Sequence, residues 1–344
     1  MALAPALVGL PGASASVVPR QVDYLRISIT DRCNERCLYC LPENFSAWTP
    51  REELLTYDEI LAVVRGAVTQ GFRHFRVTGG EPLIREGVAD FIGRLVATPG
   101  VETVQLTTNG TRLPKLARDL KRSGLERINV SLDALDPEVY RSLTRGAIEP
   151  VLEGIALCRE LGFRSLKLNT VLIRGKNDDQ IDPLIDFAAR HGLVLRFIEL
   201  MPVSLTEMLD ASNFLPIGEV MQRLRRDDLL TPIEDGTSLG RGPAKYYRLE
   251  KRGVTLGFIG ALTDLHFCDH CNKMRLTADG KIRPCLGNHI EFDLKPALRP
   301  GPLDPTGQVP SVASILQQAR VEKPLEHLFR NQYQPQRIMT AIGG

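Results

Sequence analysis

The chain has 344 residues, 43% of them hydrophobic and 24% charged, so it can form a packed core and is not expected to be disordered. Its 43 basic and 41 acidic residues leave a net charge of +2, which argues against a general polyanion-binding surface and a nucleic-acid partner. The apolar runs are far shorter than a membrane span, so we expect no membrane insertion.

The first segment, residues 1–20, is rich in alanine and contains Ala-Ser-Ala near its end, which is similar to a signal-peptide cleavage site. A secretory signal would begin with positive charges, and this segment lacks them. We therefore expect a flexible N-terminal extension rather than a signal peptide.

From residue 24 to about residue 202, short apolar runs alternate with amphipathic helical stretches. The expected strands are 24–30, 72–78, 101–108, 127–133, 163–173 and 193–201. The expected helices include 52–70, 88–97, 113–123, 150–161 and 178–191, and Asp136-Pro137 marks the start of another. Six such repeats predict a parallel α/β fold. We interpret it as a partial (β/α)6 TIM-like barrel, because an eightfold barrel would need two more units.

Polar residues occupy alternate positions on five of these strands, whereas a closed barrel fills its interior with branched apolar side chains. The positions are Arg26, Ser28 and Thr30; Arg76 and Thr78; Gln105, Thr107 and Asn109; Asn129, Ser131 and Asp133; and Lys167 and Asn169. If these residues faced the covering helices, they would be buried without partners. The pattern therefore predicts a lumen that holds a polar ligand.

The sequence changes character after residue 202. Residues to about 243 look irregular and partly helical, strands are expected at 244–251 and 254–261, and a hairpin over 274–284 turns at Asp279-Gly280. A Pro- and Gly-rich insertion at 299–310 precedes a final helix from about Val312. We thus expect a barrel unit at 21–202 and a C-terminal extension at 203–344.

The seven cysteines are an odd number in a long chain, which argues against a disulfide framework. They fall into two groups of three, Cys33, Cys37 and Cys40, then Cys268, Cys271 and Cys285, with Cys158 alone. Cys158 lies in an amphipathic helical pattern, where we expect a buried packing thiol. The grouping indicates two metal sites.

The first group has the spacing C-x3-C-x2-C and directly follows the first expected strand. Three thiolates can hold three irons of a 4Fe–4S cluster and leave the fourth iron open to chelation by an amino acid. A Gly-Gly-Glu-Pro turn, Gly79–Pro82, follows the second strand. Together the two motifs resemble the radical S-adenosylmethionine superfamily, in which the glycines lie against the methionyl group of the cofactor. In that superfamily, the reduced cluster gives one electron to the sulfonium, and a 5′-deoxyadenosyl radical then abstracts hydrogen from the substrate.

The second group, C-x2-C-x13-C, leaves two interpretations open on spacing alone. It fits a zinc site with His289 as the fourth ligand and with His266 and His270 nearby. It fits a second 4Fe–4S cluster with an open iron equally well.

From residue 24 to residue 344 the chain resembles the GTP 3′,8-cyclase family, which opens molybdenum-cofactor biosynthesis. The segments that carry this resemblance are 25–33, 76–82, 106–110, 128–136, 167–171, 196–202 and 267–275, with the terminal Gly343-Gly344. The resemblance implies a second 4Fe–4S cluster in the C-terminal extension, with its open iron at the guanine of the substrate. It also implies that the di-glycine tail reaches into the active site.

The same resemblance assigns roles to individual residues. Those implied to contact S-adenosylmethionine are Tyr39, Gly80, Ser131 and Met201. Those implied to contact GTP are Arg26, Arg76, Thr107, Lys167, Lys273, Met274 and Arg275. Arg26, Lys273 and Arg275 are the implied catalytic residues, and Arg26 is the candidate that assists protonation of the base. Many relatives have arginine where this chain has Lys273, which keeps the charge but loses the bidentate fork.

The sequence therefore predicts a radical S-adenosylmethionine lyase that converts GTP to (8S)-3′,8-cyclo-7,8-dihydroguanosine 5′-triphosphate. Two alternatives are another radical enzyme with an auxiliary cluster, such as a peptide-modifying enzyme, and a non-enzymatic zinc-binding module. The implied partners are an electron-donor protein, the next enzyme of the molybdenum-cofactor pathway and, as a candidate homodimer, a second copy of the chain. Oxygen-sensitive clusters imply a reducing compartment, so we expect the cytoplasm.

Overall fold

The computed structural model describes residues 20–206, 208–234, 239–240, 242–269, 271–299, 310–331 and 333–343. Residues 1–19 of the expected N-terminal extension lie outside the described residues. Residues 300–309 of the predicted insertion also lie outside them. His270 and Gly344 also lie outside them. No helix within the described ranges is long and apolar enough to cross a membrane.

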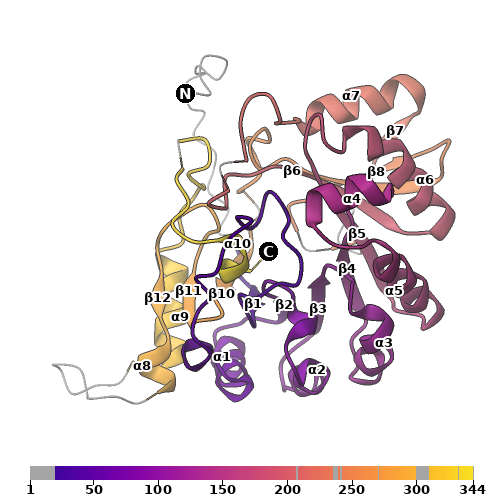
Figure 1. Ribbon diagram of the computed structural model, residues 1–344. Coiled ribbons are helices and arrows are strands. Elements are labelled where there is room, and N and C mark those ends of the chain that lie inside the picture. Colours follow the sequence, from indigo (N-terminus) through magenta and orange to yellow (C-terminus); the bar gives the residue numbers. More distant parts are fainter. Residues whose placement is uncertain are drawn as a thin grey trace.

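Six strands follow one another across the sheet in the order of the sequence (Figure 1). They are β1 (Tyr24–Ser28), β2 (His74–Thr78), β3 (Thr103–Thr108), β4 (Arg127–Ser131), β5 (Ser165–Leu172) and β6 (Val194–Glu199). Each strand pairs in parallel with the next. The predicted succession of six β/α repeats is thereby confirmed.

Helices connect these strands, and most of them cover the outer side of the sheet (Figure 1). They are α1 (Tyr57–Thr69), α2 (Val88–Val96), α3 (Leu113–Arg122), α4 (Pro137–Thr144), α5 (Glu149–Glu160) and α6 (Ile181–His191), with short 3-10 turns η1 (Arg51–Glu53), η2 (Pro82–Ile84) and η3 (Asp178–Gln180). The helix expected from residue 52 begins only at Tyr57. Thr56 is the N-cap that fixes this start. Its hydroxyl accepts a hydrogen bond from the Glu59 amide, and the Glu59 carboxylate accepts one from the Thr56 amide.

The part of the chain after residue 203 extends the same sheet at both edges. Its strands are β7 (Leu230–Pro232), β8 (Lys245–Leu249), β9 (Val254–Ile259), β10 (Lys273–Leu276), β11 (Lys281–Arg283) and β12 (Phe292–Asp293). Strand β9 joins β6 in parallel, and β10 joins β1 in parallel. The described residues thus form one sheet in the order β12-β11-β10-β1-β2-β3-β4-β5-β6-β9-β8-β7.

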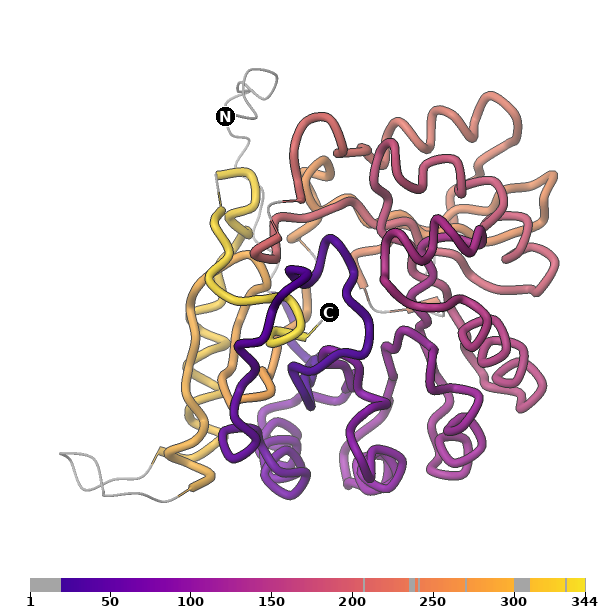
Figure 2. Tube along the Cα trace, in the orientation of Figure 1, coloured from indigo at the N-terminus to yellow at the C-terminus, as the bar shows by residue number. Residues whose placement is uncertain are grey.

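The remaining helices are α7 (Ile217–Asp227), α8 (Lys295–Leu298), α9 (Val312–Val321) and α10 (Met339–Ile342). Helix α9 begins at Val312 as predicted and packs against α1, but it is not the final helix, because the short α10 follows it. The predicted hairpin over 274–284 is present, because β10 pairs antiparallel with β11. The strands expected at 244–251 and 254–261 are β8 and β9, which also pair antiparallel. Figure 2 shows the C-terminal segment, in yellow, beside the indigo loop that follows β1.

The hydrophobic core lies between the sheet and its helices. It contains alternate strand residues such as Leu25, Ile27, Phe75 and Val77, which are fully buried. Cys158 on α5 is also fully buried in this core, so the prediction of a packing thiol is confirmed. Because side chains alternate across a strand, the residues between these core positions face the inside of the sheet.

Candidate active site

A cavity of about 350 Å³ lies on the inner side of the sheet, and both cysteine groups line it. Strand residues of the predicted polar face reach it from five strands, including Arg26, Arg76, Gln105, Ser131 and Lys167. The lumen expected from the alternating pattern is therefore present. Ser28, Thr30 and Asn129 are buried but do not line the cavity.

The first cysteine loop packs directly on the Gly-Gly-Glu turn. The Gly80 amide donates to the Thr30 carbonyl over 2.7 Å, and the Glu81 amide donates to the Arg32 carbonyl over 2.9 Å. A Cβ on Gly79 would stand 2.6 Å from the Thr30 carbonyl oxygen, and one on Gly80 would overlap the Arg32 carbonyl. Glycine is thus required here for the contact between the two loops, in addition to the predicted approach to a ligand.

Three buried carboxylates stand at the end of the cavity that the first cysteine group lines. Glu81 accepts from the Thr108 hydroxyl and from the Asn109 amide, each over 2.7 Å, and burial nevertheless raises its pKa to about 7. Asp133 accepts from the Tyr39 hydroxyl over 2.6 Å, and burial raises its pKa to about 6. Glu35 accepts from a tyrosine hydroxyl over 2.8 Å, and burial raises its pKa to about 8. This end of the cavity therefore suits a ligand with positive charge, such as a sulfonium and an amine.

The three thiols of the first group are unpaired and half-buried on the cavity wall. Burial raises the pKa of each thiol, to about 12 for Cys40, and the thiols of Cys33 and Cys40 raise the pKa of Cys37 further. All three thiols lie on one short loop, residues 33–40, and line the same cavity. Thiolates at this place need a positively charged metal group, so the loop fits a cluster held by three cysteines.

The second group reaches the same cavity from the other part of the chain. Cys268 and Cys271 precede β10, Cys285 follows β11, and all three are unpaired and half-buried. Burial would raise the pKa of Cys271, but the ammonium groups of Lys323 and Lys273 outweigh it and lower that pKa below its usual value. The site thus favours thiolate at Cys271.

Of the histidines in the zinc interpretation, His289 and His266 do not join this group, and His270 lies outside the described residues. The ring of His289 stacks on Tyr333 at 4.7 Å and does not line the cavity, and the exposed His266 contacts Asp269. Among the described residues, no group of three or more His, Cys, Asp and Glu side chains is arranged to hold a metal ion. In a 4Fe–4S cluster each cysteine binds a different iron, so its three thiolates need not converge on one ion.

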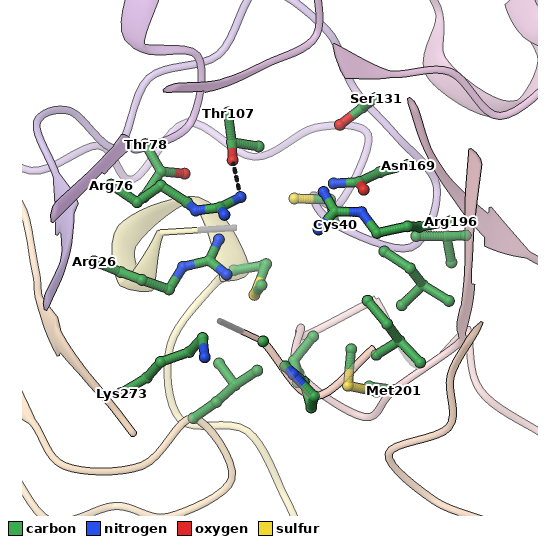
Figure 3. Close-up of a pocket in the computed structure, with 18 of the residues that line it drawn as sticks. Arg26, Cys40, Arg76, Thr78, Thr107, Ser131, Asn169, Arg196, Met201 and Lys273 are labelled. Atoms are coloured by element: carbon green, nitrogen blue, oxygen red, sulfur yellow. Dashed lines mark hydrogen bonds between the residues drawn. The ribbon is translucent and has the colours of Figure 1, made fainter. Parts of the chain in front are cut away.

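Cationic side chains converge on the middle of the cavity. Figure 3 shows Arg26, Arg76 and Lys273 reaching into it from one side and Arg196 from the opposite side. Arg76 is held by the Tyr24 hydroxyl at 2.7 Å, by the Thr107 hydroxyl at 3.1 Å and by the Gln105 side chain. This part of the cavity therefore combines several fixed positive charges with orienting hydroxyl groups.

These cations are buried close to one another, and burial lowers their pKa values. Burial and then Arg196 lower the pKa of Lys167 to about 7, and burial also lowers the pKa of Lys273 to about 7. Burial lowers the pKa of Arg26 well below its usual value, with Arg275 and Arg76 adding to the effect. Like charges that lower one another's pKa are stabilised by a polyanion between them, so this region fits a triphosphate.

Several buried polar atoms on the cavity wall have no hydrogen-bond partner among the described residues. They are Arg26 Nε, Asn169 Oδ1, Arg196 Nε and Thr340 Oγ1. An unpaired buried polar group costs about 1–3 kcal/mol, so such atoms in a cavity mark places where a ligand or water would bond.

One predicted contact is placed elsewhere by the structure. Met274 is fully buried in the hydrophobic core and does not line the cavity, whereas its neighbours Lys273 and Arg275 do. The cause is strand alternation on β10, which turns every second side chain to the other face. The Met274 side chain therefore does not reach the ligand space as predicted. The other predicted ligand-contacting residues all line the cavity.

The sequence analysis missed other cavity residues, above all Arg196 and Arg127. Arg196 lies between Leu195 and Phe197, which are both fully buried. An arginine between apolar residues of a strand is the sequence signal that could have indicated its place on the inner face. The polar alternation is incomplete on β6, because Ile198, which also lines the cavity, is apolar.

The C-terminal segment enters this site. Met339 and Thr340 on α10 line the cavity, and the Arg275 guanidinium donates to the Gly343 carbonyl. Gly343 also packs on β1 and β2, because a Cβ there would stand 3.0 Å from the Thr78 methyl group. Gly344, the last residue of the predicted di-glycine tail, lies outside the described residues.

Comparison with known proteins agrees with this site. The sequence profile of the radical SAM superfamily matches residues 27–188, and the profile called Molybdenum Cofactor Synthesis C matches residues 193–329. Among curated proteins, the GTP 3′,8-cyclase of Pelotomaculum thermopropionicum is 41% identical over 94% of this chain and 98% of its own. The enzyme of the same name from Moorella thermoacetica is 42% identical over the same shares.

Among solved structures, Streptococcus suis SuiB bound to S-adenosylmethionine aligns with a TM-score of 0.57 at 16% identity, over 86% of this chain and 68% of SuiB. That likeness concerns the fold. The two profiles together span the barrel strands and both cysteine groups, and the curated relatives align over nearly the whole chain. The chain therefore belongs to the GTP 3′,8-cyclase family of radical S-adenosylmethionine enzymes.

Proposed function

We propose that the protein converts GTP to (8S)-3′,8-cyclo-7,8-dihydroguanosine 5′-triphosphate, the first reaction of molybdenum-cofactor biosynthesis. The observation that carries this proposal is one cavity with two groups of three free cysteines on its wall, buried carboxylates at one end and several buried cations in its middle. This distribution of charge separates a cationic cofactor from an anionic substrate within a single cavity. Its cationic wall favours a nucleoside triphosphate over a peptide substrate.

At the cofactor end, Cys33, Cys37 and Cys40 would hold the first 4Fe–4S cluster. When bound, this cluster and S-adenosylmethionine supply the radical that removes the hydrogen atom from ribose C3′. The proposed contacts of S-adenosylmethionine are Tyr39, Gly80, Ser131 and Met201, all on the cavity wall. Tyr39 is fixed by its bond to Asp133, so the aromatic ring has one defined orientation beside the cofactor space.

At the substrate end, Cys268, Cys271 and Cys285 would hold the second cluster near the guanine. The proposed GTP contacts are Arg26, Arg76, Thr107, Lys167, Lys273 and Arg275, joined by Arg196. Arginine and lysine from different strands can hold the phosphate oxygens and fix the ribose in register with the radical.

After C3′ bonds to C8, the base must take up one electron and one proton. We assign assistance in this protonation to Arg26, whose pKa is lowered by burial and by neighbouring arginines, because a lower pKa makes the guanidinium a stronger acid. Lys273 and Arg275 on β10 complete the proposed catalytic set, and both line the cavity beside the second cysteine group.

We also propose the organisation and setting of the enzyme. Residues 21–202 would form the catalytic barrel, and residues 203–344 would carry the second cluster. The reaction needs an electron-donor protein, and the next enzyme of the pathway would take up the product. A second copy of the chain is proposed as a homodimer partner. The unpaired state of all seven cysteines supports a reducing compartment such as the cytoplasm.

The test is an anaerobic assay of the reconstituted chain with GTP, S-adenosylmethionine and a reductant. We expect about eight irons per chain, with 5′-deoxyadenosine and an isomer of GTP that both depend on added GTP. Iron and 5′-deoxyadenosine without a GTP isomer would reject GTP as the substrate. Zinc without S-adenosylmethionine binding would reject the radical chemistry itself.

A matched pair of cysteine variants controls this assay. Cys37→Ala removes a thiol from the cavity wall and should abolish cleavage of S-adenosylmethionine. Cys158→Ala removes a buried thiol of the core and should keep the full iron content and turnover. Equal loss in both variants would point to general damage rather than to cluster ligation.

A further inference from the structure

Lys323, just beyond the end of α9, joins the two segments that carry the second cysteine group. Its ammonium group stands 3.6 Å from the Cys271 sulfur and donates to the Lys273 carbonyl over 2.8 Å and to the Pro284 carbonyl over 2.7 Å. Lys273 lies two residues after Cys271, and Pro284 immediately precedes Cys285. One side chain therefore connects the β10 and β11 sides of the group.

This bonding accounts for every donor of the ammonium group. Lysine has three N–H donors, and here they go to one sulfur and two carbonyl oxygens. Although Lys323 reaches the cavity wall, its donors are directed at the protein rather than into the ligand space. Its role therefore differs from that of the cations placed at the substrate.

The chain that follows Lys323 supports the same group. The guanidinium of Arg20 donates to the Cys268 carbonyl over 3.2 Å, to the Pro324 carbonyl over 2.8 Å and to the Leu325 carbonyl over 3.0 Å. Arg20 thus fixes the chain just after Lys323 to the cysteine loop, while Lys323 itself contacts Cys271.

We propose that Lys323 is a positioning residue for the second iron–sulfur cluster, which sets the geometry of its cysteine loops and raises its reduction potential. Reduction adds one negative charge to the cluster, and a cation bonded to a ligand sulfur stabilises that reduced state relative to the oxidised one. Bonds from the protein to ligand atoms commonly change metal affinity by about 10–100-fold. The inference rests on the second cluster of the proposed function.

The test is an EPR-monitored redox titration of the reconstituted full chain, comparing wild type, Lys323→Met and Arg320→Met. The first cluster is identified by the change of its signal when S-adenosylmethionine is added, and it serves as an internal reference. Arg320 on α9 is the matched control, because it is a nearby cation that bonds to the Gln70 carbonyl and forms no hydrogen bond with a cysteine among the described residues.

For Lys323→Met we expect the ratio of reduced to oxidised second cluster to fall at least tenfold at a given applied potential. For a one-electron couple, this corresponds to a reduction potential lowered by about 59 mV. The first cluster should keep its potential, and Arg320→Met should change neither cluster. An unchanged second cluster in Lys323→Met, or an equal shift of both clusters, would overturn the inference.

If Lys323→Met folds with native circular dichroism but holds about four irons, the positioning role is supported, provided that Arg320→Met holds the full complement. If Lys323→Met does not fold, Lys323→Gln decides, because its neutral amide can still donate to the two carbonyls. We expect that variant to show a lowered potential, and a wild-type potential would overturn the inference.

A wild-type chain without a second cluster would overturn the proposed function as well, whereas an unchanged potential overturns this inference alone.

Discussion

The guanidinium of Arg275 on β10 donates a hydrogen bond to the backbone carbonyl of Gly343, 68 residues further along the chain. Both residues are buried, and the bond holds the C-terminal segment against the cavity wall. Arg275 also belongs to the proposed substrate contacts, so the position of the tail and the position of a substrate-binding cation depend on each other.

Replacing Gly343 with alanine should therefore lower product formation. Gly343 has φ +88, and a Cβ there would stand 3.0 Å from Thr78 and 3.2 Å from Ser28, so the tail must move away from Arg275. We expect formation of the cyclised product to fall about 10–100-fold, with iron content unchanged, as measured by mass spectrometry under single-turnover conditions.

Gly162→Ala is the control for this variant. Gly162 also has positive φ, +66, but no atom lies within 4 Å of its Cβ position and it does not line the cavity. This substitution should lower the thermal unfolding temperature slightly and leave turnover intact. Similar loss of product in both variants would show that backbone strain, rather than the tail contact, is responsible.

Replacing Arg26 with alanine should stop the cyclised product and leave iron content intact. Arg26 lines the cavity from β1, and it does not contact either cysteine group through a hydrogen bond among the described residues. Loss of a general acid typically costs about 100-fold or more in rate. Arg26→Lys, which keeps a cation at this place, should regain part of the activity. Normal turnover in Arg26→Ala would remove Arg26 from the proposed mechanism.

Replacing Gly80 with alanine should selectively remove the first cluster. The new Cβ would overlap the Arg32 carbonyl, so the Gly-Gly-Glu turn and the cysteine loop must separate. We expect iron to fall from about eight to about four per chain, together with loss of S-adenosylmethionine binding in equilibrium dialysis. Gly218→Ala on α7, where the added Cβ meets no atom within 4 Å, should keep the full iron content. Full iron content in Gly80→Ala would mean that the two loops tolerate separation.

GTP affinity should fall as pH rises above 7, partly through Lys167. Burial and the neighbouring Arg196 hold the pKa of Lys167 at about 7 in the free protein. A bound triphosphate favours the protonated form, so binding takes up a proton above that pH and weakens by at most about tenfold per pH unit for each such group. Isothermal titration calorimetry between pH 7 and 8.5 should show a shallower dependence in Lys167→Met than in wild type. Lys167→Arg should show the same shallower pH dependence as Lys167→Met but bind GTP more tightly than that variant. Identical slopes of GTP affinity against pH in all three proteins would contradict the assignment.

Much of this architecture could be predicted from local patterns along the chain. Alternating polar residues such as Arg76 and Lys167 identified the inner face, because side chains on a strand alternate with a period of two. The spacing from Cys33 to Cys40 identified the first metal site, since all three ligands lie on one loop. The helix expected from residue 52 was wrong at its start, where the side-chain bond of Thr56 outweighed the helical pattern of the preceding residues.

The meeting of the two cysteine groups in one cavity was decided by tertiary structure. It depends on β10 pairing with β1, a contact between residues almost 250 positions apart, and periodicity within either strand carries no information about that partner. The same pairing places Lys273 and Arg275 beside Arg26, turns Met274 into the core and gives Lys323 its place between two cysteine segments. Residue chemistry thus determined which ligands and charges the protein has. The pairing of distant strands, whose stability comes from burial and backbone hydrogen bonds summed over the whole sheet, determined where they converge.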